Sequence, residues 1–257
     1  MTQQKTVLIT GASGGIGREL AFQFAKDGYQ LVLVARSEKR LQQLAEELTP
    51  APVAIKVKDI SSPEGVYELV NDLKAENIKV DVLVNNAGFG LYGEFTETSI
   101  DEELNMIDLN IKTLTLLTKL LIPSMMKNKT GHILNVASIA AFQPGPLMAV
   151  YYATKAYVLS FSEALENELQ GTGVGVSVLC PGPTETGFSD RANLEQSKLF
   201  KDNVMDAASV AKIAYEGMKQ KKSLIIPGMK NRLLTIVVRL LPRKTVTKVV
   251  RNAQERS

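Results

Sequence analysis

Short apolar segments alternate with longer amphipathic segments along most of this chain. Seven apolar runs have the length and composition of strands: 6–10, 30–35, 52–57, 80–85, 131–138, 175–180 and 223–227. Their nearly continuous hydrophobicity is typical of a parallel sheet that is covered on both faces. Helical patterns occupy 15–27, 37–48, 63–76, 100–127, 151–170 and 207–220. No linker or repeat interrupts this alternation, so the sequence predicts a single α/β domain with a doubly wound parallel sheet.

The composition excludes several classes of protein. The 257 residues carry 30 basic and 27 acidic side chains, a net charge of +3 that is too balanced to indicate a nucleic-acid partner. The chain has one cysteine, Cys180, and one histidine, His132, so we expect neither an internal disulfide nor a metal site. The first ten residues do not resemble a secretory signal, and no apolar run approaches the roughly 20 residues of a membrane span. We therefore expect a soluble, cytoplasmic protein.

A glycine-rich turn joins the first predicted strand to the first predicted helix. Gly11 can form a tight turn, Gly15 allows close approach of the backbone to a ligand, and Gly17 allows close packing of helix and strand. The helix that follows offers free N–H groups and the positive end of its dipole to a pyrophosphate. The spacing is G-x-x-x-G-x-G, and glycine clusters also form ordinary loops. The position after the first strand nevertheless favours a dinucleotide site.

Arg36 and Ser37 follow the second predicted strand. NAD-binding proteins of this architecture usually have an acidic residue there, which binds the ribose 2′-hydroxyl. The planar fork of an arginine can instead bind a 2′-phosphate. The sequence therefore favours NADP(H) over NAD(H). The alternative is that Arg36 only begins a solvated basic helix with Lys39 and Arg40.

Tyr151 and Lys155 lie four residues apart in a predicted helix, so their side chains share one face. Tyr152 is rotated by about 100° around the helix axis and should face packing or a subunit contact. Taken alone, the pair is compatible with a packed tyrosine and a solvated lysine. A cation one turn away would, however, stabilise a phenolate and lower the pKa of the tyrosine, which suits acid–base chemistry.

Six motifs appear in the order and at the spacing of the short-chain dehydrogenase/reductase family, which the chain resembles over residues 5–227. They are TGASGGIG (10–17), NNAG (85–88), LNIKT (109–113), NVASIAA (135–141), YYATK (151–155) and CPGPTET (180–186). The resemblance implies a Rossmann-like fold of about seven strands with helices on both faces. It also implies hydride transfer with a nicotinamide cofactor. One departure is Gly14, where many NADP-preferring relatives have a basic residue.

The resemblance also implies a role for individual residues. The catalytic set would be Asn110, Ser138, Tyr151 and Lys155. In this set the tyrosine transfers a proton, the serine binds the substrate oxygen, the lysine also holds the cofactor ribose, and the asparagine positions a water. The residues expected to contact the cofactor are Gly11, Ser13, Gly15, Ile16, Gly17, Arg36, Ser37, Asp59, Ile60, Asn86, Ala87, Gly88, Tyr151, Lys155, Pro181, Gly182 and Thr186.

These features favour an oxidoreductase that acts on a carbonyl compound or secondary alcohol. The segments 88–95, 139–150 and 187–204 should line the substrate site. Their apolar residues, which suggest an apolar substrate, are Phe89, Leu91, Phe142, Leu147, Met148 and Phe188. Two alternatives remain open: a dinucleotide-binding sensor or scaffold without turnover, and an epimerase or dehydratase on the same scaffold.

Two further features concern assembly. Helices 100–127 and 151–170 carry more apolar residues than one core-facing stripe needs, which predicts a homodimer, or a homotetramer. Residues 229–257 form an apolar extension of the domain in 1–228, with eight basic residues and one acidic residue. This extension could cover the substrate pocket, pack on another subunit, or lie on an anionic membrane surface as a peripheral contact.

Overall fold

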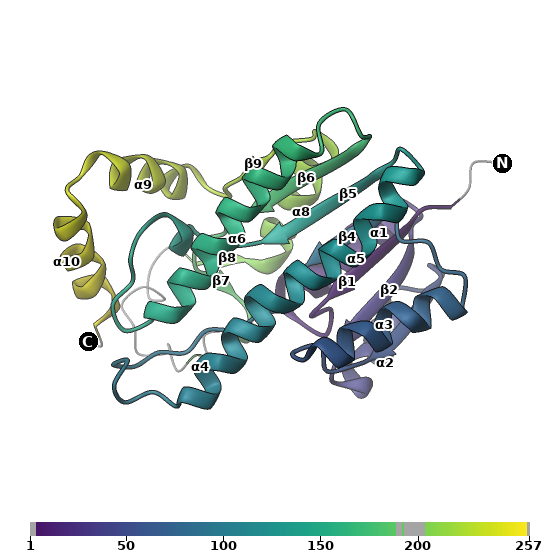
Figure 1. The fold of residues 1–257 in the computed structure, drawn as a ribbon, viewed down its shortest axis with the longest axis horizontal. Helices are drawn as coiled ribbons and strands as arrows, with labels where there is room; N and C mark the ends of the chain where they lie inside the picture. Colours follow the sequence, from purple (N-terminus) through teal and green to yellow (C-terminus); the bar gives the residue numbers. More distant parts are fainter. Residues whose placement is uncertain (1–3, 189–191, 193–203, 256–257) are drawn as a thin grey trace.

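The computed structural model describes residues 4–188, 192 and 204–255. Seven parallel strands form one sheet in the order β3-β2-β1-β4-β5-β6-β9. They are β1 (Thr6–Thr10), β2 (Gln30–Ala35), β3 (Val53–Val57), β4 (Val82–Asn85), β5 (Gly131–Val136), β6 (Val174–Leu179) and β9 (Leu224–Ile225). The predicted fold class, a Rossmann-like doubly wound sheet, is confirmed (Figure 1).

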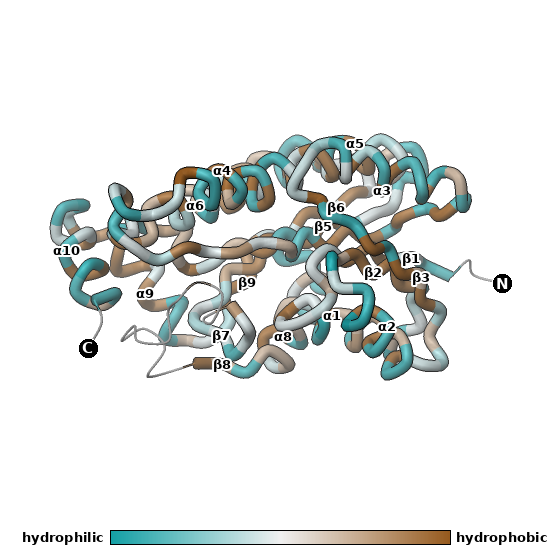
Figure 2. The backbone as a smooth tube through the Cα atoms, turned by 90° about the horizontal axis from the view of Figure 1, so that it is seen from below, coloured by the Kyte–Doolittle hydropathy of each residue, from teal (hydrophilic) through white to brown (hydrophobic). Residues whose placement is uncertain are grey.

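Helices cover both faces of this sheet (Figure 2). One layer consists of α1 (Gly15–Lys26), α2 (Glu38–Glu47) and α8 (Ala207–Lys219). The opposite layer consists of α3 (Pro63–Ala75), α5 (Leu114–Lys127) and α6 (Ala149–Glu168). Each layer buries its own apolar cluster against the strands, with Phe24 and Leu41 in the first and Leu69 and Leu117 in the second. The strands therefore read as continuous apolar runs because both of their faces are buried.

Short polar side chains mark where several helices begin. The Ser37 Oγ accepts a hydrogen bond from the Arg40 N–H at 3.5 Å, and the Ser62 Oγ accepts one from the Gly65 N–H at 3.3 Å. The Asp206 carboxylate accepts one from the Ser209 N–H at 2.7 Å. Each bond satisfies a backbone donor that has no partner within its helix. These caps define where the helices begin, and the observed starts lie close to those predicted from the sequence.

The predicted helix 100–127 is not a continuous α-helix. It consists of α4 (Ile100–Ile107), a π-helical segment (Asp108–Thr113) and α5. The wider turn of a π-helix shifts the side chains that follow it relative to an unbroken α-helix, and such segments are frequent at functional sites. Here the segment carries Asn110, which is 2% exposed. Apolar periodicity could not reveal the insertion because both flanking helices keep their own buried stripe.

The C-terminal extension forms two helices, α9 (Met229–Leu240) and α10 (Arg243–Gln254). Leu241 is extended (φ −91°, ψ 149°) because it precedes Pro242, which disfavours the helical conformation of its neighbour. Both helices lie at one end of the molecule, beyond the helix layers (Figures 1 and 2). A short second sheet pairs β7 (Thr184–Glu185) with β8 (Met205–Asp206). No helix within the described residues is long and apolar enough to cross a membrane.

Candidate active site

One large cavity lies at the carboxyl ends of the central strands. β1 and β4 are neighbours in the sheet, and the chain leaves them toward opposite faces, which opens a crevice at this point. The cavity has a volume of about 740 Å³. All but two of the predicted site residues line it, although they come from segments spread between residues 11 and 186. The two exceptions are Gly17 and Asn110.

The glycine-rich turn leaves space at one end of the cavity. Gly11 has φ +64°, a conformation that favours glycine, and a Cβ on Gly17 would lie 2.4 Å from the Asn86 Nδ2. Gly17 is therefore needed for packing of α1 on the loop after β4, rather than for lining the cavity. The N-cap of α1 is Gly14, whose side-chain position is open, so no side chain caps the helix. The first N–H groups of α1 are thus oriented to bind an anion.

Thr10 and Asn86 connect the two central loops. The Thr10 Oγ donates to the Val84 carbonyl oxygen at 3.2 Å and accepts from the Asn86 and Ala87 N–H groups at 3.0 Å. The Asn86 side chain donates to the carbonyl oxygens of Thr10 (2.9 Å) and Gly11 (3.1 Å). These bonds join the loop after β1 to the loop after β4. Sequence reasoning assigned no role to Thr10, although it is the first residue of the TGASGGIG motif.

Basic side chains surround the outer part of this end. Arg36 lies 3.8 Å from the Asp59 carboxylate, and both side chains are more than half exposed. Arg40 and Lys58 also line the cavity, and Lys58 forms ion pairs with Glu68 and Asp72. Arg40 and Lys58 are absent from the predicted site. The one available signal was the i, i+4 spacing of Arg36 and Arg40, which equally suits a solvated helix face.

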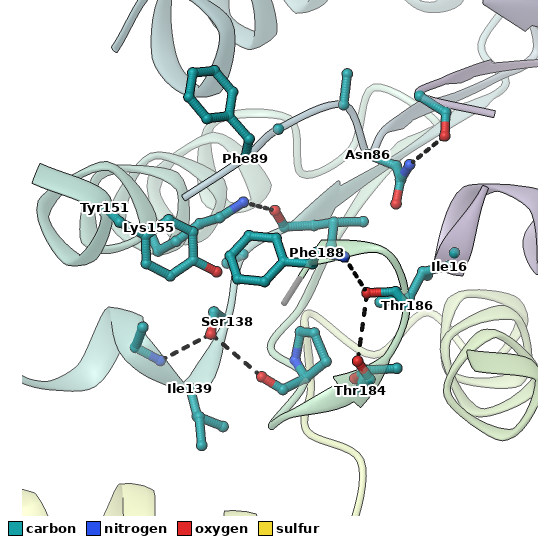
Figure 3. Close-up of a pocket in the computed structure, with 18 of the residues that line it drawn as sticks. Ile16, Asn86, Phe89, Ser138, Ile139, Tyr151, Lys155, Thr184, Thr186 and Phe188 are labelled. Atoms are coloured by element: carbon teal, nitrogen blue, oxygen red, sulfur yellow. Dashed lines mark hydrogen bonds between the residues drawn. The ribbon is translucent and has the colours of Figure 1, made fainter. Parts of the chain in front are cut away.

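The other end of the cavity contains Ser138, Tyr151 and Lys155 (Figure 3). Ser138 follows β5, and its Oγ accepts from the Ala140 N–H at 3.1 Å and donates to the Pro181 carbonyl oxygen at 3.4 Å. Tyr151 and Lys155 both come from α6, as the four-residue spacing predicts. The Lys155 Nζ donates to the Val136 carbonyl oxygen at 2.9 Å and lies 5.8 Å from the centroid of the Tyr151 ring.

Burial controls the ionisation of this pair. Burial raises the pKa of Tyr151, and the hydrogen bond with Ser138 opposes that increase. Burial also lowers the pKa of Lys155 to about 8. The expectation that Lys155 would lower the pKa of Tyr151 is not met in this structure, because desolvation of the phenolate outweighs other influences. Tyr151 is therefore a neutral phenol, which is the form that donates a proton.

Asn110 lies behind the cavity wall. Its Oδ1 accepts from the Phe89 N–H at 3.1 Å, and its Nδ2 donates to the Phe89 carbonyl oxygen (3.0 Å) and to the Thr154 Oγ (3.1 Å). A Cβ on Gly88 would lie 2.8 Å from the Asn110 Oδ1 and 3.6 Å from the Lys155 Nζ. The amide therefore holds the loop after β4 close to Lys155. Its expected role in positioning a water stays a prediction.

Comparisons with known proteins agree with this geometry. A family profile described as "short chain dehydrogenase" matches residues 5–197. An uncharacterized oxidoreductase of Staphylococcus epidermidis is 34% identical over 211 residues, which cover 81% of this chain and 91% of the relative. One of Staphylococcus saprophyticus is 36% identical over 213 residues, with the same coverage. This chain belongs to the short-chain dehydrogenase/reductase family.

Solved structures of this family resemble the whole chain. A short-chain dehydrogenase from Sphingobium yanoikuyae in complex with NADPH has a TM-score of 0.83 at 32% identity, covering 98% of each chain. A short-chain dehydrogenase/reductase from Burkholderia phymatum in complex with NAD has a TM-score of 0.82 at 26% identity, covering 99% of this chain and 98% of the other. A bulky-bulky ketone specific alcohol dehydrogenase from Comamonas testosteroni has a TM-score of 0.79 at 30% identity, covering 93% of each.

The residues present fit the nicotinamide dinucleotide that the short-chain dehydrogenase/reductase fold binds. The open backbone at Gly14 and the uncapped start of α1 leave a cradle for a pyrophosphate. The other expected cofactor contacts Ser37, Ile60, Ala87, Pro181, Gly182 and Thr186 also line the cavity. Thr186 lies against the glycine-rich turn, since a Cβ on Gly15 would lie 3.0 Å from its Cγ2. Within the described residues, no cluster of side chains could hold a metal ion.

The apolar side chains that were expected at the substrate site divide between the cavity and other parts of the structure. Phe89, Met148 and Phe188 line the cavity as expected, and the rings of Phe188 and Tyr151 lie 5.3 Å apart. Leu91 and Leu147 instead border a separate depression, and Phe142 packs in a core cluster. Residues 189–191 and 193–203 of the third predicted loop lie outside the described residues.

The C-terminal helices supply the remaining wall. Leu234, Val238 and Leu241 of the α9 region and Val246 and Val250 of α10 line the cavity. Of the three roles considered for the extension, a cover over the pocket therefore agrees with the structure.

Tyr152 also lines the cavity, although it was expected to face packing or a subunit contact. Its hydroxyl accepts a hydrogen bond from the Gln254 Nε2 at 2.6 Å. Gln254 belongs to α10, and its backbone carbonyl oxygen accepts one from the Tyr92 hydroxyl at 2.9 Å. Sequence reasoning missed this contact because nothing local connects residues that are about a hundred positions apart.

Proposed function

We propose that this protein is an NADP(H)-dependent oxidoreductase that interconverts an apolar carbonyl compound and its secondary alcohol. The observation that carries the proposal is the shared cavity. A neutral buried phenol, Tyr151, lies beside Ser138 and Lys155, between an anion-binding helix start and an apolar wall. Residues 1–228 would supply the cofactor site and the chemistry, and 229–257 would complete the substrate end.

The reaction would need few groups from the protein. The bound cofactor would supply or accept a hydride at the substrate carbon. Tyr151 would donate its phenolic proton to the substrate oxygen during reduction and remove it during oxidation. The Ser138 hydroxyl would turn from the Pro181 carbonyl toward the same oxygen and stabilise the negative charge that develops there. With a pKa of about 8, Lys155 is mainly cationic at neutral pH and would stabilise the tyrosinate left after proton donation.

The proposed preference for NADP(H) rests on the basic side chains around the outer cavity. Arg36 directly precedes the N-cap of α2, Arg40 lies in the first turn of that helix, and both line the cavity. Asp59, beside Arg36, would not take the role of the acidic residue that binds the ribose 2′-hydroxyl at the end of β2 in NAD-binding proteins. It follows β3 instead, and its carboxylate accepts a hydrogen bond from the Ser61 N–H at 3.0 Å. Solved relatives include complexes with NADPH and with NAD, and titration of the protein with NADPH and NADH tests the preference.

The proposed substrate is apolar because the wall opposite the catalytic residues consists mainly of aliphatic and aromatic side chains. The ketone-specific dehydrogenase from Comamonas testosteroni supports a bulky carbonyl compound as the first class to test. We further propose a homodimer through α5 and α6. Leu116, Leu120 and Phe161 are only partly buried on these helices, and Tyr157 stacks on Phe161 at the surface with the ring centroids 5.7 Å apart.

The test is substrate-dependent oxidation of NADPH by the purified protein with a panel of aliphatic, aryl and bicyclic ketones. Turnover that is lost in Tyr151→Phe would support the proposal. A protein that binds NADPH but turns over no carbonyl compound or alcohol would contradict it and favour a sensor. Conversion of a substrate without net change in NADPH would instead favour an epimerase or dehydratase.

A further inference from the structure

We propose that α9 docks on an anionic lipid surface through the face that points away from the substrate cavity. The helix has two apolar faces, whereas a helix that only covers a pocket needs one. The inner face contains Leu234 and Val238, which line the cavity, and the buried Thr235; Leu234 is itself 54% exposed. The outer face contains Met229, Leu233, Ile236 and Leu240, which we call the outer stripe. None of these four side chains lines the cavity.

The outer stripe is both continuous and exposed. At about 100° per residue, its four positions fall within roughly 60° of the helix circumference. Their side chains are 86%, 62%, 57% and 79% exposed, in chain order. Large apolar side chains exposed in one row are uncommon on a free protein surface and usually mark an interaction site. The stripe begins directly after Gly228, and α9 as a whole lies in the part of the molecule that projects beyond the sheet (Figure 1).

The charge around the stripe indicates which partner covers it. Lys230 lies on one side of the stripe along the helix, and Arg232 and Arg239 lie on the other. From 229 to 255 the extension carries seven basic residues and one acidic residue, while residues 1–228 have a net charge of −4. An amphipathic helix with exposed apolar side chains between cations is the pattern of helices that lie in the interface of an anionic bilayer.

A second copy of this chain fits the stripe less well. A two-fold contact would bring the stripe against its own copy and therefore place the cations of both copies together. Like charges at such an interface oppose association. An anionic lipid surface instead pairs with the cations while its acyl region buries the apolar side chains. The cavity wall formed by the inner face would then lie next to the membrane.

The hydrogen bonds that attach the start of α9 to the rest of the protein are compatible with docking on lipid. The Asn231 side chain donates to the Pro227 carbonyl oxygen at 2.7 Å, and the Arg232 Nε donates to the Ile226 carbonyl oxygen at 3.1 Å. Both bonds hold the start of α9 against the loop after β9. The helix is thus held in place without using the outer stripe, and docking needs no rearrangement of the substrate site. This inference does not depend on the proposed reaction.

Vesicle flotation with the full-length protein tests the inference. The probes are vesicles of phosphatidylcholine alone and vesicles that also contain phosphatidylglycerol. We expect binding to the anionic vesicles that weakens as salt is raised, since exposed charges are screened. Leu233→Ser with Leu240→Ser should weaken that binding by about tenfold or more, because two apolar anchors are lost. NADPH binding of this variant should stay unchanged, because neither residue lines the cavity.

The matched control is Ile100→Ser with Leu104→Ser, which removes two exposed apolar side chains (63% and 51%) from α4. This control should float with the vesicles like the unmodified protein. The inference is overturned by absence of binding to anionic vesicles, by equal binding to both vesicle types, or by equal loss in the control. A smaller assembly of Leu233→Ser/Leu240→Ser in lipid-free light scattering would also overturn it, since a second copy would then cover the stripe.

Discussion

The two adjacent tyrosines make the sharpest test of the proposed chemistry. Both line the cavity and both are buried, but only Tyr151 lies beside Ser138 and one turn before Lys155. Tyr151→Phe removes the proton donor and keeps the ring. A positioned acid–base group contributes about 10²–10⁴ in rate, which corresponds to about 3–5 kcal/mol in the activation barrier. Turnover should fall by that factor, while NADPH affinity should change little.

Tyr152→Phe should have the opposite profile. It removes the hydroxyl that accepts a hydrogen bond from the Gln254 Nε2, and the Gln254 side chain is fully buried. The Gln254 Oε1 has no hydrogen-bond partner within the described residues, so the variant would leave the whole amide unpaired. An unpaired buried group costs about 1–3 kcal/mol, which lowers the Tm of a chain of this size by roughly 2–4 °C per kcal/mol. Turnover should stay within about tenfold of the unmodified enzyme.

Three measurements on each variant separate these effects: steady-state oxidation of NADPH with a saturating ketone, fluorescence titration of NADPH, and thermal unfolding. Our reasoning is refuted if Tyr152→Phe loses as much turnover as Tyr151→Phe. It is also refuted if Tyr151→Phe keeps a tenth or more of the original rate. If Tyr151→Phe loses NADPH affinity but Tyr152→Phe does not, Tyr151 would have a role in cofactor binding instead of proton transfer.

Of four further predictions, two concern the cofactor, one concerns acid stability and one concerns assembly. Arg36→Ala should weaken NADPH binding by about 10- to 100-fold, from the loss of a charged hydrogen bond of roughly 1.5–3 kcal/mol, and should leave NADH binding nearly unchanged in parallel titrations. Gly14→Arg should strengthen NADPH binding in the same titrations, because Gly14 is extended and no atom lies within 4 Å of its Cβ position. Burial lowers the pKa of His132 from 6.5 to about 4. Between these pH values the unfolded chain binds a proton that the folded chain does not, so the free energy of unfolding should fall by about 3 kcal/mol as the pH is lowered. Urea unfolding of His132→Gln should show a weaker dependence of this free energy on pH. Light scattering at micromolar concentration should give a dimer that survives truncation after Gly228, and a monomeric full-length chain would contradict the proposed α5–α6 contact.

Much of the candidate catalytic site could be predicted because its arrangement depends on local spacing. Tyr151 and Lys155 share a helix, so 3.6 residues per turn determine that they face the same side. Ser138 follows a strand of a parallel sheet, and the carboxyl ends of such strands meet at one edge. The ionisation of the pair was not predictable, since the sequence shows a cation four residues from a phenol but not the degree of burial that dominates both pKa values.

Other features depended on contacts between distant residues. The π-helical segment around Asn110 has no periodicity that distinguishes it from the helices on either side. Arg40 was named only in the alternative in which Arg36 begins a solvated helix, and the way α2 follows β2 brings it to the cavity. Pro242 indicated a break in the extension, but the sequence could not show that α10 returns to the pocket.

The sequence by itself determined the fold class, the glycine turn and the partners within α6, because apolar periodicity and fixed helical geometry act over short distances. Only the tertiary structure decided that the C-terminal helices close the substrate end, with Gln254 bonded to Tyr152 and an apolar stripe left on the outer side of α9. The amphipathic pattern of the extension is compatible with a pocket cover, a subunit contact or a membrane contact. Which face is buried depends on where Gly228 and Pro242 direct the chain, and that direction is set by packing against loops far away in the sequence.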